Sequence, residues 1–153
     1  MILEFQKTHA GARTPDRANP SDAGLDVFYS PEDQSGPGIY AVPGTSVILG
    51  TGLKFGVPHG YMLEVKNRSS VAAKLNLVVG ACVIDSGYDG EVFINVHNIG
   101  RDTRVIQDGD KIAQLVMMPV VHFQPQENTE GTLYDYPKTI SNRGTGALGS
   151  TDK

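Results

Sequence analysis

Residues 45–55 read TSVILGTGLKF, and this stretch carries the pattern that decides the fold class. Its residues are mostly β-branched, aliphatic or aromatic, which favours a pleated strand. Eighteen glycines and nine prolines divide the chain into short apolar pieces of this kind. The others are VFY at 27–29, YMLEV at 61–65, LNLVVG at 75–80, EVFINVHN at 91–98 and KIAQLVMMPVVHF at 111–123. Strands of this number and size predict an all-β sandwich or barrel.

Turn-forming residues separate the expected strands. They are Pro43-Gly44, Pro58-His59-Gly60, Ser86-Gly87, Asp89-Gly90 and Asp108-Gly109. One stretch, SSVAAKL at 69–75, is typical of a short helix, and Ser69 or Ser70 is its expected N-cap. The sequence contains no internal repeat.

The length and the change of composition near residue 124 predict the domain organisation. A chain of 153 residues fits one domain with one core. Residues 124–153 are polar and end in RGTGALGSTDK, which is too rich in Gly, Ser and Thr to pack by itself. We therefore expect a β-rich core domain at 1–123, followed by a mobile arm at 124–153.

Composition also excludes several classes of protein. Cys82 is the single cysteine and the start, MILEFQKTHAGAR, does not resemble a signal peptide, so we expect a reducing, cytoplasmic setting. No apolar stretch approaches the roughly 20 residues that cross a bilayer, so we expect no membrane insertion. The net charge of −4 argues against direct nucleic-acid binding. The four histidines lack metal-ligand spacing, so we expect no protein-bound zinc.

Asp85 is the unusual residue of the stretch GACVIDSGYDGE at 80–91. It follows an apolar strand directly and precedes a turn, so we expect its carboxylate to be partly desolvated. Such a carboxylate can hold and polarise a water as a general base, although a simple turn-former is an equally good interpretation. Tyr88 would present its ring to a flat ligand or a sugar, or be an ordinary half-buried hairpin residue.

Two segments offer donors for an anion. Arg68-Ser69-Ser70 lies where a strand leads into the short helix, so hydroxyls, backbone N–H groups and a guanidinium would converge. Taken alone, a capped helix with a surface arginine is the simpler interpretation. The segment from Arg143 to Thr151 is Gly-rich and suited to closing over phosphates, but alone it is typical of a disordered tail.

Two polar residues within apolar strands complete the candidates. Asp26 would orient neighbouring groups or hold an inner arginine, and an acid on a strand edge is equally plausible. Gln114 must find hydrogen bonds if it is buried, which indicates a polar ligand or a subunit interface, whereas an outward-facing side chain needs neither.

The order of five segments resembles the trimeric dUTPase family over nearly the whole chain. The segments are DAGLDV at 22–27, RSS at 68–70, VIDSGYDGEV at 83–92, GDKIAQL at 109–115 and RGTGALGST at 143–151. The resemblance implies a distorted jelly-roll or β-barrel subunit with one short helix and a flexible C-terminal arm. It also implies a homotrimer in which three chains share each active site.

The resemblance implies hydrolysis of dUTP to dUMP and pyrophosphate by attack of water on the α-phosphorus. Mg²⁺ would be held through the triphosphate rather than by the protein. This activity would limit uracil incorporation into DNA and supply dUMP. Asp85 matches the water-activating aspartate of the family.

The other roles are implied residue by residue. The hairpin from about Val79 through Val83 to Phe93 would hold uracil through its backbone, and Tyr88 would pack beneath deoxyribose. Asp26 would support the site. The residues expected to bind the phosphate chain or close over the substrate are Arg68, Ser69, Ser70, Gln114, Arg143, Leu148, Gly149, Ser150 and Thr151.

Several positions depart from the family pattern. Leu148 stands where an aromatic residue commonly stacks on uracil, so the contact with the base would be weaker. Ala147 replaces a usual glycine, and Lys111 replaces a frequent arginine. Cys82 and Val79 also differ from common family residues, so uracil recognition would depend more on the main chain.

Two alternatives remain. The dCTP deaminases of the same superfamily look similar, but their deamination relies on a glutamate where this chain has Asn95, which cannot shuttle a proton. A non-enzymatic, nucleotide-binding regulator is the second alternative. Its partner surface would lie in the extra segments SPEDQSGPGIY at 30–40 and NTEGTLYDYPK at 128–138. The expected location is intracellular for a cellular protein and equally for a viral protein in its host cell.

Overall fold

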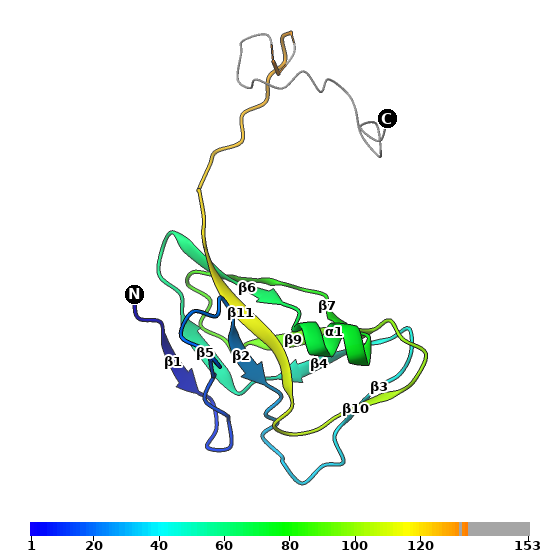
Figure 1. Cartoon of the computed structure of the whole chain (residues 1–153). Coiled ribbons are helices and arrows are strands. Elements are labelled where there is room, and N and C mark those ends of the chain that lie inside the picture. Colours follow the sequence, from blue (N-terminus) through cyan, green and yellow to red (C-terminus); the bar gives the residue numbers. More distant parts are fainter. Residues whose placement is uncertain (132, 135–153) are drawn as a thin grey trace. The chain divides into compact units, whose positions relative to one another are not determined.

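The computed structural model describes residues 1–131, 133 and 134. Within this part the chain forms eleven β-strands and one short helix, which confirms the predicted all-β fold (Figure 1). No helix in the described part is long and apolar enough to span a membrane. Met1–His122 form one compact unit, which contains all the strands and the helix of the described part. The predicted arm lies largely outside the described residues, so its boundary at residue 124 stays a prediction.

The strands form four antiparallel sheets. The largest has the order β2-β11-β6-β8 and consists of Leu25–Phe28, Lys111–Pro119, Tyr61–Lys66 and Val83–Asp85. The second has the order β4-β9-β7 and consists of Ser46–Gly50, Phe93–Asn98 and Leu77–Val79. Two-stranded sheets pair β1 (Glu4–Lys7) with β5 (Leu53–Gly56) and β3 (Ile39–Ala41) with β10 (Arg104–Ile106).

The stretch 45–55 forms two strands of different sheets rather than one. β4 ends at Gly50 and β5 begins at Leu53, and Gly52 between them has a φ of +67°. Thr51 is fully buried at this corner, where its hydroxyl donates to the Val92 carbonyl over 2.7 Å. The glycine therefore lets the chain pass from one sheet to the other.

The core is built from side chains that the period-two pattern places on inner faces. The largest fully buried aliphatic residues are Leu49, Leu53, Leu63, Ile94 and Leu115, which come from five different strands. Burial of each such side chain stabilises the fold by about 1.5–3 kcal/mol relative to exposure. This shared core fixes the relative positions of the two larger sheets.

Helix α1 spans Ser69–Leu75, as the sequence predicts, but its N-cap prediction was wrong. The N-cap is Arg68, with φ −86° and ψ 133° and no side-chain capping hydrogen bond. Ser69 and Ser70 are already helical and lie exposed. Arg68 keeps the extended backbone of the preceding segment, and its side chain forms an ion pair with Asp26 instead of capping the helix.

Strands β1, β3 and β10 were not anticipated. All four residues of β1 are exposed, so its sequence shows no alternation between a buried and a polar face. β3 and β10 have three residues each, too few to give a periodic signal. β3 lies at the end of the segment 30–40, which the sequence indicated to be a loop.

Candidate functional site

Four of the predicted phosphate-binding residues line one pocket of about 310 Å³, here called the arginine pocket. Its walls are Ala18, Asp22, Ala23, Gly24, Asp26, Arg68, Ser69, Ser70 and Gln114. Strand pairing explains the convergence, because Gln114 of β11 lies opposite Asp26 of β2 and also opposite Lys66 of β6. Arg68 follows β6 after one intervening residue. Hydrogen bonding of β11 to both β2 and β6 thus brings together segments that are far apart in the chain.

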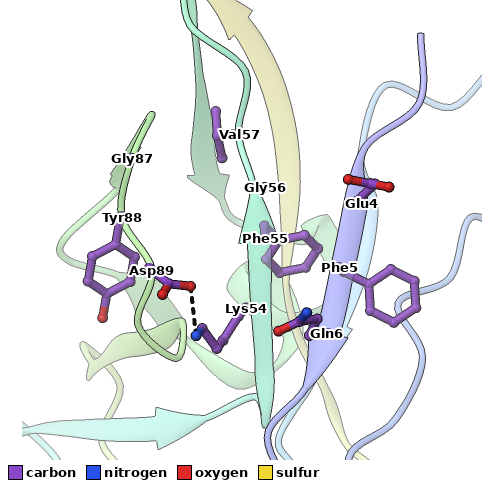
Figure 2. A pocket seen from close by; sticks show the side chains of 10 residues that line it. All are labelled: Glu4, Phe5, Gln6, Lys54, Phe55, Gly56, Val57, Gly87, Tyr88 and Asp89. Carbon is purple, nitrogen blue, oxygen red and sulfur yellow. Dashed lines mark ion pairs between the residues drawn. The ribbon is translucent and has the colours of Figure 1, made fainter.

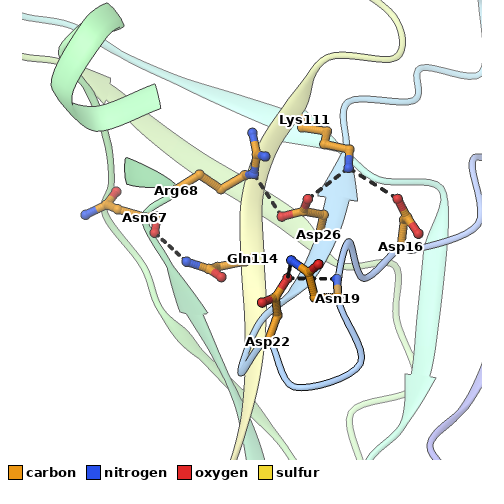
Figure 3. A network of polar contacts seen from close by, with 8 residues as sticks. All are labelled: Asp16, Asn19, Asp22, Asp26, Asn67, Arg68, Lys111 and Gln114. Carbon is orange, nitrogen blue, oxygen red and sulfur yellow. Dashed lines mark hydrogen bonds and ion pairs between the residues drawn. The ribbon is translucent and has the colours of Figure 1, made fainter. Parts of the chain in front are cut away.

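Asp26 anchors the cations of this pocket (Figure 3). Arg68 Nε donates to Asp26 Oδ1 over 2.8 Å, and Lys111 Nζ donates to Asp26 Oδ2 over 3.0 Å. The Asp26 side chain is only 13% exposed, so this pairing compensates its desolvation. Because Arg68 uses Nε for Asp26, the edge formed by its two terminal nitrogens is not used in this bond. That edge has the geometry for bidentate anion binding.

Lys111 links the same network to the N-terminal region. Its ammonium also donates to Asp16 Oδ2 over 3.3 Å and lies 5.4 Å from the centre of the Phe28 ring. The hydrogen bond to Asp26, and then that to Asp16, raises the pKa of Lys111 above its ordinary value. The lysine therefore stays charged and holds Asp26 in place for Arg68.

Gln114 is oriented by Asn67 and by Gly24. Gln114 Nε2 donates to the Asn67 carbonyl over 2.9 Å. Gly24 is buried, and a Cβ at that position would collide with the Gln114 side chain. The small residue of the DAGLDV segment therefore makes room for the amide of the GDKIAQL segment.

The predicted base lies in a different hollow, here called the tyrosine pocket, of about 220 Å³. It is lined by Val83, Ile84, Asp85, Tyr88, Glu91, Val92 and Phe93. The turn after β8 folds the Tyr88 ring back, so that its hydroxyl donates to the Glu91 carbonyl over 2.8 Å. Gly90 is required there, because a Cβ would overlap the ring. The apolar wall includes Val83 and Phe93, which are each more than half exposed.

Asp85 is exposed, so the expected partial desolvation was wrong for this chain by itself. The reason is topological: β8 is an edge strand, and Asp85 is its last residue. Among the described residues the Asp85 carboxylate makes no ion pair or side-chain hydrogen bond. It therefore keeps its lone pairs for a water or a ligand.

The two pockets lie toward opposite ends of the β6 strand. Asp85 pairs with Met62 near the start of β6, whereas Gln114 pairs with Lys66 at its end. Four residues of strand correspond to about 13 Å, and β8 and β11 lie on opposite sides of β6, which adds roughly two strand spacings of 4.8 Å. One chain therefore does not bring Asp85 next to Arg68 and Gln114.

The remaining predicted residues lie elsewhere. Val79 is in β7, where its backbone N–H donates to Asn67 Oδ1 over 2.8 Å, and it does not line the tyrosine pocket. Arg143, Leu148, Gly149, Ser150 and Thr151 lie outside the described residues.

Sequence reasoning missed Asp16 and Asn67 and gave Lys111 no role. Asp16 reaches the network through a single β-bridge to Asp26, which leaves no sequence pattern. Asn67 uses its backbone carbonyl for Gln114 and its side chain for Val79, and it directly precedes RSS. A polar residue at that strand end was the one available signal.

Comparison with known proteins gives consistent results. A dUTPase family model matches residues 10–147. The deoxyuridine 5'-triphosphate nucleotidohydrolase of Solibacter usitatus (strain Ellin6076) is 34% identical over 157 residues, covering 100% of this chain and 97% of that protein. The protein of the same name from Chlamydia muridarum (strain MoPn / Nigg) is 31% identical over 149 residues, covering 96% of each.

Solved structures share the fold. A variant of the Staphylococcus bacteriophage 80alpha dUTPase with dUpNHpp has a TM-score of 0.79 at 25% identity, over 98% of both chains. A variant of the dUTPase from phage phi11 of S. aureus, described for its coordination of a structural Mg(II) ion, has a TM-score of 0.73 at 25% identity. That match covers 86% of this chain and 99% of the other.

Proposed function

This chain belongs to the dUTPase family and is a dUTP diphosphatase, and from this premise we propose that Asp85 activates the attacking water. The water oxygen forms a bond to the α-phosphorus while its proton passes to the Asp85 carboxylate. The bond from the α-phosphorus to the bridging oxygen breaks, and pyrophosphate leaves with those electrons. An exposed carboxylate without an ion pair to another described residue suits this role, because no neighbouring cation occupies the oxygens that would accept the proton.

The observation that carries the proposal is the division of the chemistry between two pockets of one chain. The arginine pocket offers phosphate donors, and the tyrosine pocket offers a base and an apolar wall. Their separation along β6 supports a site in which Asp85 of one copy faces the arginine pocket of another. That the assembly is a homotrimer comes from the family pattern. The partner surface would also supply the desolvation that Asp85 does not have in a single chain.

The phosphate chain would be bound by Arg68, Ser69, Ser70 and Gln114. Asp26 has its two oxygens occupied by Arg68 and Lys111, which supports a positioning role rather than chemistry. Arg143, Ser150 and Thr151 would close on the γ-phosphate, with Leu148 and Gly149 beside them. These five residues come from the family pattern alone.

Uracil and deoxyribose would occupy the tyrosine pocket. Val83 and Phe93 border it with exposed apolar side chains, and the Tyr88 ring would lie beneath the sugar and exclude a 2′-hydroxyl. Val79 would take part only through the hairpin backbone.

Mg²⁺ would enter this site bound to the triphosphate of the substrate. The ion demands about six oxygen ligands and usually keeps waters while binding one or two carboxylates and substrate phosphates. Asp26 already binds two cations, so we propose that triphosphate oxygens and water hold the ion. When bound, Mg²⁺ would neutralise charge on the phosphates.

The deaminase alternative is disfavoured by Asn95. Its Oδ1 lies 2.8 Å from His97 Nε2 in β9, and a carboxamide does not carry a proton between water and a base. The regulatory alternative stays a prediction, and so does its partner surface at residues 30–40 and 128–138. The cytoplasmic location also stays a prediction.

A substrate panel tests the proposal. With Mg²⁺, dUTP should give dUMP and pyrophosphate, while dCTP gives no ammonia and UTP reacts poorly. Asp85→Asn should bind dUTP as the wild type does and lose most turnover. Ammonia release from dCTP would reject the assignment, and full turnover by Asp85→Asn would reject the base.

A further inference from the structure

The turn that carries Tyr88 is held by strand β5 and by the residues directly before and after that strand. Ser86 Oγ donates to the Val57 carbonyl over 2.9 Å at the start of the turn. At its end, the Gly52 N–H donates to Glu91 Oε1 over 2.8 Å. Between these, the Lys54 ammonium pairs with Asp89 Oδ1 over 2.7 Å. The turn is thus held at its beginning, its tip and its end.

Of these three contacts, the ion pair at the tip is the one nearest to Tyr88 in sequence, and it acts beside the hydrogen bond from the Tyr88 hydroxyl to the Glu91 carbonyl. Figure 2 shows Asp89 pointing toward Lys54 while the Tyr88 ring lies on the other side of the turn. Both residues of the pair and Tyr88 border a pocket between β1, β5 and the turn. Because Asp89 directly follows Tyr88, a shift of Asp89 would change the backbone that carries the ring.

The two partners differ in freedom. The Lys54 side chain is 29% exposed and belongs to a strand paired with β1, whereas the Asp89 side chain is 91% exposed. Gly87 has a φ of +90°, so the turn bends at a residue with little conformational restriction. Lys54 is therefore the partner held in place by a strand, and its ion pair restrains Asp89 at the tip of the turn.

We propose that Lys54 is a positioning residue for sugar specificity, because its pair with Asp89 keeps the Tyr88 ring against the 2′ position of the nucleotide. The inference rests on the proposed placement of deoxyribose on Tyr88. It predicts that loss of the pair loosens discrimination between dUTP and UTP and leaves the chemical step intact.

Steady-state kinetics with dUTP and UTP test the inference. Lys54→Met keeps the aliphatic stem and removes the charge. It should reduce the ratio of kcat/KM for dUTP over UTP by about 1.4- to fivefold, the range that exposed ion pairs contribute, with kcat for dUTP unchanged. Asp89→Asn should give the same ratio, and the double variant should be no worse than either. The reversed pair, Lys54→Asp with Asp89→Lys, should restore it.

Salt and a second lysine provide the controls. At about 1 M salt the wild-type ratio should fall toward that of Lys54→Met, whose own ratio should not change. Lys7→Met removes an exposed lysine from β1, which pairs with β5, and should behave as the wild type.

Two results would overturn the inference: an unchanged ratio in Lys54→Met, or equal losses for dUTP and UTP. A wild-type protein that does not prefer dUTP over UTP would instead reject the proposed function.

Discussion

Replacement of Gly24 by alanine should abolish most activity without touching a catalytic group. The new Cβ would lie 2.6 Å from Gln114 Cδ and 2.9 Å from Gln114 Cβ. Ordinary carbon contacts are about 3.5–4.0 Å, so the overlap is about 1 Å. Rotation of the terminal amide alone does not relieve it, because Gln114 Cβ is fixed to a strand paired on both sides. The Gln114 side chain must therefore leave the arginine pocket.

The size of the effect follows from the lost donor. Removal of one well-placed donor from an electrostatic site costs about 10²–10³ in kcat, so we expect a loss of roughly a hundredfold. The forced contact should also lower the free energy of unfolding by about 1–3 kcal/mol. Both quantities are accessible from pyrophosphate release and from thermal unfolding at fixed protein concentration.

A double-mutant cycle separates this cause from general damage. Gln114→Ala should lose a similar factor in rate, and the double variant should lose no more than either single variant. Gln114→Ala should also recover stability in the Gly24→Ala background. Gly36→Ala is the matched control, since a Cβ there meets no atom within 4 Å. Wild-type kinetics for Gly24→Ala, or multiplicative losses in the double variant, would refute the reasoning.

Removal of residues 141–153 should weaken catalysis while the oligomer persists in sedimentation; dissociation would show that the segment is structural. Leu49→Ala should lower the free energy of unfolding by about 3 kcal/mol, because Leu49 is fully buried, and a loss below about 1 kcal/mol would contradict this. The pKa of Lys111 is raised in the folded protein above its ordinary value of 10.5. The charged lysine therefore contributes its full stabilisation of the folded state at pH values below 10.5, and this contribution is lost as the pH rises through the folded pKa. The difference in free energy of unfolding between the wild type and Lys111→Met should therefore decrease only in strongly alkaline solution. A decrease at neutral pH would contradict this prediction.

The elements that the sequence predicts are those with a strong local pattern. SSVAAKL predicts helix α1 at 69–75, and KIAQLVMMPVVHF at 111–123 predicts the long strand β11, because propensity and burial agree there. The strand ends earlier than this stretch, at Pro119. The exposed strand β1 has no such agreement, so its pairing with β5 depends on tertiary contact alone. The N-cap was missed because Arg68 is not a typical capping residue: its side chain does not cap the helix and instead pairs with Asp26, 42 residues away.

The candidate site divides in the same way. The order of the motifs indicates which residues to examine, and strand pairing brings Asp26, Arg68 and Gln114 into one pocket. No local pattern shows that Asp85 lies in a separate pocket, because that separation follows from the register of β8 and β11 on β6. The pairing of Lys54 with Asp89 joins two residues without a shared motif.

The most direct test of the account is complementation between two inactive variants. Arg68→Ala removes the phosphate donor, and Asp85→Asn removes the base. If each site takes these residues from different copies, co-expression in equal amounts should restore about one quarter of wild-type dUTP turnover, because each intact donor is present with a probability of about one half. Activity no greater than that of the two variants measured separately would contradict a site shared between copies.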